Sequence, residues 1–164
     1  MSKLRRYLLM ACVMLSATAA MADVIFSMRD LFREMPDSLL PYLTRNNRLD
    51  FIDFLDSNMK ADVKNAFDGI SEMTSLCDDS LTIRLNDALT VDIRLLRLDD
   101  SVADSCRQVI CVVRTWHLSD GGTESNAQFY RTDWQPIEPP LCLTADDRQR
   151  LLSWNKSTIL KTIQ

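Results

Sequence analysis

The chain has 164 residues, of which 46% are hydrophobic and 26% charged, and its formal net charge at pH 7 is −4. A chain of this length can bury a core without relying on disulfide bonds, so we expect one globular domain. The acidic balance and the absence of a basic cluster beyond residue 22 argue against nucleic acid as a partner, because phosphate backbones are bound by grouped Lys and Arg side chains.

The first 22 residues have the order of a secretory signal peptide. Three basic residues precede an apolar run from Tyr7 to Leu15, and small residues follow up to Ala22. This run is too short for a membrane anchor, which needs about twenty strongly apolar residues. We predict cleavage after Ala22, so that the mature chain begins at Asp23, has no transmembrane span, and carries 16 basic against 23 acidic residues, a net charge near −7.

A second candidate cleavage site precedes Cys12. Residues 9–12 (LMAC) resemble the lipobox of bacterial lipoproteins, in which the cysteine becomes the lipidated first residue. Only five apolar residues precede Cys12, whereas a signal peptide normally has an apolar core of about 7 to 15 residues. The sequence therefore favours a protein released into the periplasm or the cell exterior, with a lipoprotein anchored through Cys12 as the alternative.

Apolar residues at helical spacing predict two helices at the start of the mature domain, residues 23–164. Ser27 can cap a short helix that Pro36 ends. The second helix is predicted over residues 46–59, with Asn47 as its N-cap. Its buried side is expected to consist of Leu49, Phe51, Ile52, Leu55 and Met59.

Beyond Gly69 the apolar pattern changes to a period of two, which is typical of strands. Residues 81–85 and 89–95 alternate in this way, so each of these strands buries one face. Residues 108–116 are apolar on both faces, which predicts a central strand. A Gly-Gly turn at 121–122 leads to a further strand over 126–134, which prolines at 136, 139 and 140 end; Thr144 then begins a short C-terminal helix.

Short connections between successive strands favour antiparallel pairing, because parallel neighbours need crossovers of about a dozen residues or more. Helices followed by a run of strands indicate that the two kinds of element segregate. We therefore predict an α+β fold in which the N-terminal helices pack on an antiparallel meander sheet of about five strands, followed by a short C-terminal helix.

Two stretches resemble a known family. They are MPDSLLPYLTRNNRLDFIDFLDS (35–57) and FYRTDWQPI (129–137), together with the strand pattern between them. This succession resembles an uncharacterised domain-of-unknown-function family of secreted gut Bacteroidales proteins. The resemblance implies an exported protein and brings no assigned activity and no catalytic residues.

The residues that could carry chemistry are few. His117 is the only histidine, and no nearby cysteine or carboxylate arrangement predicts a triad or a zinc site. Asp50, Asp53 and Asp56 follow one flank of the second helix and are better explained as a solvated face than as a metal site. We predict no metal, no cofactor and no catalytic set from these patterns.

The four cysteines of the mature chain leave the disulfide state open. An exported protein can form disulfides, but an extended chain would place Cys106 and Cys111 roughly 16 Å apart, well beyond the usual limit of about 7 Å. Pairing would then join Cys77 and Cys142 to those two cysteines in some order. The alternative is that no disulfide forms and Cys111 is a small buried apolar residue.

Three short motifs resemble acceptor sites for O-linked sugars on exported proteins of that bacterial group. They have an Asp-Ser-apolar pattern and place the serines at Ser38, Ser80 and Ser101. Asp-Ser is also ordinary turn and cap chemistry, which is the alternative interpretation.

Two classes of function are compatible with the sequence. The first is a non-enzymatic binding or accessory domain that contacts an unknown protein or small ligand through a sheet face or edge, with Tyr130, Trp134 and His117 as the predicted contact residues. The second is a hydrolase whose site would be assembled around His117 and carboxylates in three dimensions. The lack of a recognisable catalytic set favours the first class.

Overall fold

A computed structural model describes residues 25–98, 108–139 and 143–150. Within these ranges an α-helix, α2 (Met28–Glu34), a short 3₁₀ turn, η1 (Asp37–Leu39), and a second α-helix, α3 (Arg45–Asp56), precede all strands. The predicted signal peptide with its two cleavage sites, Ser101, Cys106 and Cys142 lie outside the described residues.

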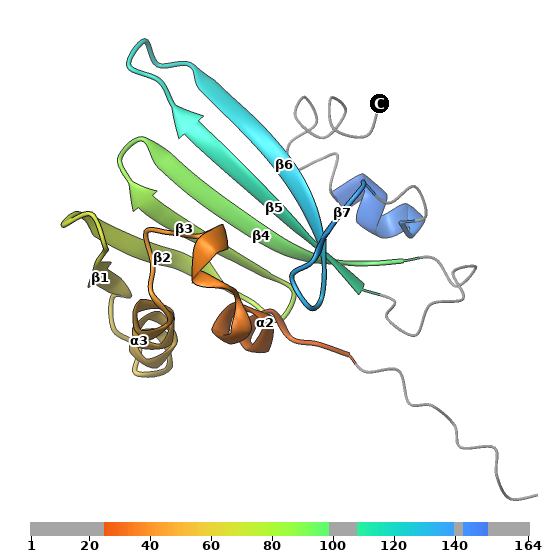
Figure 1. The fold of residues 1–164 in the computed structure, drawn as a ribbon, viewed down its shortest axis with the longest axis horizontal. Coiled ribbons are helices and arrows are strands. Elements are labelled where there is room, and N and C mark those ends of the chain that lie inside the picture. The colour runs from red at the N-terminus through yellow and green to blue at the C-terminus, as the bar shows by residue number, and fades with distance from the viewer. Residues whose placement is uncertain (1–24, 99–107, 140–142, 151–164) are drawn as a thin grey trace, which may run out of the picture.

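Seven strands form one antiparallel sheet whose spatial order is the order of the chain (Figure 1). Their bounds are β1 (Asp62–Lys64), β2 (Ile70–Leu76), β3 (Ser80–Asn86), β4 (Leu89–Arg97), β5 (Gln108–His117), β6 (Thr123–Arg131) and β7 (Pro136–Ile137). The prediction of an α+β fold with an antiparallel sheet is confirmed, and the predicted number of about five strands is wrong.

The strands that the sequence missed lack a clean alternation. β2 shifts its register against β3 between Met73 and Ser75, so its apolar residues do not recur with a period of two. β1 and β7 have only three and two residues. Pro136 was expected to end the preceding strand but begins β7, an edge position where a residue without an N–H group is tolerated.

One face of the sheet and the helices share a single buried apolar cluster. On the helical side this cluster contains Phe32 of α2 and Phe51 and Ile52 of α3, all with no exposed surface. The sheet contributes the inward residues of β3, β4 and β5: Leu81, Ile83, Leu85, Val91, Ile93, Leu95, Ile110 and Val112. In Figure 1 the helices lie over one face of the sheet, at its β1–β3 side.

The start and end of α3 differ from the sequence prediction. Thr44, not Asn47, is the N-cap, and the two residues form a reciprocal capping box in which each side chain accepts the other's backbone N–H. The helix ends at Asp56, so Met59 lies beyond it and is 56% exposed instead of buried.

Arg48 of α3 is buried, although its side chain is charged. Only 1% of its surface is exposed, and its guanidinium donates to the carbonyl oxygens of Phe32, Met35 and Leu43 and to the carboxylate of Asp37 at 2.7 Å. All four acceptors lie at the end of α2 and in the connection to α3. Arg48 therefore holds the two helices and the segment between them together.

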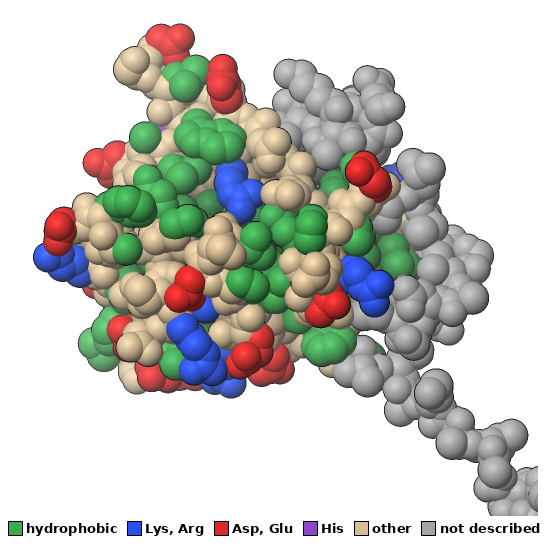
Figure 2. Space-filling model, in the orientation of Figure 1, with side chains coloured by type: hydrophobic (Ala, Val, Ile, Leu, Met, Phe, Trp, Pro, Cys, Tyr) green, Lys and Arg blue, Asp and Glu red, His purple; other side chains and the backbone are tan. Residues whose placement is uncertain are grey.

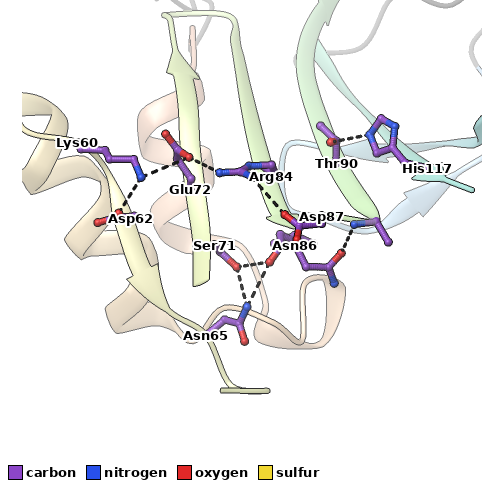
Figure 3. Close-up of polar contacts among 12 residues, drawn as sticks. Lys60, Asp62, Asn65, Ser71, Glu72, Arg84, Asn86, Asp87, Thr90 and His117 are labelled. Atoms are coloured by element: carbon purple, nitrogen blue, oxygen red, sulfur yellow. Dashed lines mark hydrogen bonds and ion pairs between the residues drawn. The ribbon is translucent and has the colours of Figure 1, made fainter. Parts of the chain in front are cut away.

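The opposite face of the sheet has two parts. Over β4–β6 it is apolar and buried, with Val109, Cys111 and Phe129 in a second cluster that includes Leu143. Over β1–β3 it is polar and carries ion pairs such as Glu72–Arg84 at 2.6 Å (Figure 3). Residues 145–150 are helical, and Thr144 caps this helix through the N–H of Asp147, as the sequence predicts.

Candidate functional site

Two of the predicted contact residues are buried. Tyr130 is 2% and Trp134 5% exposed, and their rings pack together with centroids 5.9 Å apart. The Trp134 indole N–H donates to the carbonyl oxygen of Leu31 at 3.0 Å. The expectation that these two side chains are exposed on a strand is wrong: β6 ends at Arg131, and Trp134 lies in the following turn, where it ties the sheet to α2.

His117 is exposed at the end of β5. Its ring nitrogen lies 3.1 Å from the hydroxyl of Thr90 on β4 (Figure 3). Among the described residues no carboxylate or cysteine hydrogen-bonds to this ring, and no group of three or more metal-ligating side chains could hold an ion. Within the described part of the chain, His117 therefore has no carboxylate or cysteine partner for acid–base or metal chemistry.

A cleft of about 680 Å³ opens at the other end of the sheet. Its lining includes Phe26, Leu95 and Gln108 and four acidic residues. Gln108 and His117 are the first and last residues of β5, so this cleft lies roughly 30 Å from the histidine, at about 3.3 Å per residue. The cleft and His117 therefore cannot form one site.

Two of the four acidic residues that line the cleft, Asp79 and Asp147, have structural partners. Arg150 contacts the carboxylate of Asp79 at 2.7 Å and holds the pKa of that carboxyl below its usual range. The buried Asp147 accepts the backbone N–H of Arg97 at 2.8 Å and the hydroxyl of Thr144 at 3.1 Å. These contacts fix the helix that begins at residue 145 against β4, which gives the carboxylates a structural role.

The exposed aromatic residue of the sheet is Trp116. Alternation along β5 places Ile110, Val112, Arg114 and Trp116 on the helix-bearing face, and the first two are fully buried beneath the helices. Arg114 is half-buried and donates to the carbonyl oxygen of Leu39 in η1 at 3.0 Å. Trp116 lies beyond this contact and is 38% exposed.

Neighbouring strands extend the surface around Trp116. Leu89 of β4 and Glu124 of β6 lie directly opposite Trp116, and Asn126 lies opposite Arg114. Leu118, just past the end of β5, is 40% exposed. We call this set the Trp116 face: Leu89, Arg114, Trp116, Leu118, Glu124 and Asn126. Figure 2 shows hydrophobic side chains gathered on this side of the molecule, between the helices and the hairpin tips.

Sequence reasoning missed the Trp116 face because it treated residues 108–116 as one strand buried on both sides. The signal was present at the end of that run: after Val113 the sequence changes to Arg-Thr-Trp-His. A change from continuous apolar residues to charged and polar ones marks the point at which a central strand leaves the core.

The remaining candidate residues do not come together in a common site within the described structure. Cys111 is buried without a disulfide, and burial raises the pKa of its thiol to about 12; Cys77 is exposed and also free. Ser38 is exposed in η1, whereas Ser80 is half-buried and its hydroxyl donates to Asp79. Of the three helix aspartates, Asp56 pairs with Arg29 at 2.8 Å.

Comparison with known proteins gives a family and a fold relative. The model of a family described as "Protein of unknown function (DUF3256)" matches residues 21–162. A solved domain of an uncharacterized protein from Porphyromonas gingivalis W83 is similar over 70% of this chain, with a TM-score of 0.55 and 26% sequence identity. The match covers 55% of that other chain, so this chain spans about half its length. No curated protein matches.

Proposed function

This chain belongs to the DUF3256 family of Bacteroidales proteins, and we propose that it is an exported, non-enzymatic binding domain that contacts its partner through the Trp116 face. The observation that carries the proposal is the exposure of Trp116 and Leu118 at the end of a sheet face whose other apolar residues are buried or half-buried. Apolar side chains exposed together, with polar residues at their rim, are typical of protein interaction sites.

The composition of the Trp116 face supports a protein partner. Trp and Arg are enriched among the residues that dominate binding energies at interfaces. Arg114 is held by its bond to the carbonyl of Leu39, so it loses little conformational freedom on binding. Trp116 lies on a regular strand that is paired on both sides, so its backbone also loses little conformational freedom on binding.

The export part of the proposal is supported by the signal-peptide order of residues 1–22 and by the family match, which begins at residue 21. The start of the family domain thus falls within two residues of the expected mature terminus at Asp23. In the described part of the chain no helix is long and apolar enough to cross a membrane. We place the mature protein in the periplasm or at the cell exterior, with anchoring through Cys12 as the alternative.

Site-specific crosslinking followed by an affinity measurement tests the contact surface. A photo-crosslinking amino acid at position 116 should capture a partner in native cells, and the same residue at position 59 should not. With the purified partner, Trp116→Ala should weaken binding by about tenfold or more. Met59→Ala removes a more exposed apolar side chain outside the surface and should leave the affinity unchanged. Equal affinities of the parent and Trp116→Ala would refute the proposed surface.

A further inference from the structure

The outer edge of β6 is largely uncovered. β6 pairs with β5 along its whole length, from Thr123 to Arg131. On its other side β7 pairs only with Phe129 and Tyr130. Figure 1 shows β7 beside one end of β6 only. Six residues, 123–128, therefore have no neighbouring strand on that side within the described structure.

Strand alternation identifies the backbone groups that point to this open edge. The Arg131 N–H donates to the carbonyl of Gln135, toward the β7 side. Backbone groups of alternate residues point to the same side of an antiparallel strand, which assigns Thr123, Ser125 and Ala127 to the open edge. In the described part of the chain none of these three has a backbone bond beyond the ladder to β5.

The opposite edge of the sheet is protected in the usual ways. β1 has only three residues and ends at an exposed lysine, Lys64. The Asn47 side chain donates to the Lys64 carbonyl at 3.2 Å, and the Ala66 N–H donates to the carbonyl of Tyr42 at 3.0 Å. Residues 123–128 (TESNAQ) contain no proline and no lysine, and their register with β5 has no bulge. Short strands, lysines and covering groups block edge pairing, and among the described residues none of these protects the β6 edge at 123–128.

We propose that the open edge of β6, residues 123–128, binds an extended peptide of a partner protein as an added strand. This inference rests on the proposed binding function and specifies its ligand. Main-chain hydrogen bonds to Thr123, Ser125 and Ala127 supply the affinity, as in other cases of strand addition. The edge adjoins the Trp116 face, since Glu124 lies directly opposite Trp116.

The side chains on the two faces of β6 define the chemistry of the peptide. On the helix-bearing face Glu124 is the only charged residue of the open edge, beside the exposed Asn126 and Gln128. On the other face Ala127 belongs to the buried apolar cluster. The side chains of an added strand alternate between the same two faces. The peptide should therefore alternate basic or polar residues with apolar ones, a basic residue facing Glu124.

Two of the registers in which a second copy of the chain could pair with this edge are unfavourable. Antiparallel pairing of two β6 strands centred on Asn126 would bring Thr123 of one copy opposite Phe129 of the other, a position that β7 already occupies. Pairing centred on Glu124 avoids β7 but places the two glutamates opposite each other, which is destabilising. Pairing centred on Ser125 uses only residues 123–127 and sets Glu124 opposite Asn126, so sedimentation is the measurement that distinguishes a second copy from a peptide. A peptide that presents a basic residue pairs with the charge of Glu124, which a second copy in this register does not.

A peptide-display selection on the purified mature protein tests the inference. The probe is a library of randomised peptides of about eight residues, long enough to cover the open edge. We expect enrichment of peptides with alternating basic and apolar residues. When the best peptide binds, amide hydrogen exchange should slow at Thr123, Ser125 and Ala127, while Glu124 and Asn126, bonded to β5, are protected with or without it.

Two matched variants at position 125 distinguish the contribution of the backbone N–H to peptide binding from that of the side chain. Ser125→Pro removes an N–H that has no partner within the described fold and should weaken peptide binding by about tenfold or more. Ser125→Ala removes the hydroxyl contact to Thr115 but keeps the N–H, and should bind like the parent. If Ser125→Pro does not fold, N-methylated peptides provide the test. N-methylation of the alternate peptide amides that face β6 should abolish binding, and N-methylation of the other amides should not.

The outcomes separate this inference from the proposed function. Binding that Trp116→Ala weakens but Ser125→Pro does not, without slowed exchange at the edge, would overturn strand addition and leave the Trp116 face in place. A selection that enriches no peptide, or a dimer in sedimentation that Ser125→Pro dissociates, would also overturn the inference. Peptides that bind independently of both variants would contradict the inference and the proposed surface together.

Discussion

Arg48 shows how a single residue organises the helical layer. A buried guanidinium is stabilising only when its donors are satisfied, and here backbone carbonyls accept most of them. The sequence held no signal for this residue, because arginine is rarely buried and position 48 looks like an ordinary polar site on a helix. Its role depends on the irregular chain between α2 and α3.

Arg48→Met keeps an unbranched apolar stem but removes the donors, and should lower the free energy of unfolding by about 2 to 4 kcal/mol, because buried carbonyls lose their partners. Chemical denaturation monitored by circular dichroism measures the change. Arg45→Met is the control: Arg45 is exposed and its nearest ion-pair contact, to Glu34, is 3.4 Å long, so a change below about 0.5 kcal/mol is expected. Equal losses in both variants would contradict the role of Arg48.

Asp92 offers a residue-scale test of electrostatics. Burial is the main cause that raises the pKa of this carboxyl, while a 2.6 Å bond from the Thr82 hydroxyl and the charge of Arg94 act in the opposite direction. A raised pKa in the folded state means that the ionised form is disfavoured there, so the fold loses stability as pH rises through that pKa.

Asp92→Asn should therefore stabilise the protein at neutral pH, and the gain should shrink as the pH falls into the range where Asp92 is protonated. Denaturation of the parent and the variant across pH 3 to about 8, a range that spans carboxyl titration, measures the difference. A variant that is less stable at neutral pH, or a difference that does not vary with pH, would show that burial does not dominate at this residue.

At the scale of elements, the alternating strands could be predicted and the irregular ones could not. β3, β4 and most of β5 and β6 bury one face or both with a regular period, which is a local property of the sequence. The bulged β2 and the two short edge strands are defined by their neighbours. The Trp116 face was missed for the same reason, since where the helices stop covering β5 is a tertiary property.

The central position of β5 gives an element-scale prediction. Ile110 and Val112 have no exposed surface and pack in the main core. Ile110→Asp and Val112→Asp should each unfold the domain or lower its free energy of unfolding by more than about 4 kcal/mol, because each buries an unpaired charge. Asn126→Asp on the exposed face of β6 is the control and should change little. Thermal unfolding of either core variant like that of the parent would contradict the assigned sheet order.

At the scale of the whole molecule, every inner strand of the described sheet pairs with the strands before and after it in sequence. Such a meander can be extended only at its two edges, and one edge is protected while most of β6 is open. The acidic balance of the chain adds a preference for partners that present basic residues.

The proposal of export also concerns the whole chain. We expect the mature protein to begin at Asp23 and to carry no acyl chain, because cleavage there leaves a complete apolar core in the signal peptide. N-terminal sequencing and intact mass of the native protein measure this. A blocked, lipidated Cys12 as the first residue would place the domain on a membrane instead.

Complementation of a strain that lacks the gene tests the central claim most directly, through two adjacent exposed residues of β5. At equal abundance and export, Trp116→Ala should fail to restore the phenotype, because it removes the aromatic centre of the contact surface. His117→Ala should restore it like the parent, because the only hydrogen bond of the ring within the described residues is to Thr90. The reverse pattern, with His117→Ala inactive and Trp116→Ala active, would contradict the binding function and favour a hydrolase built on His117.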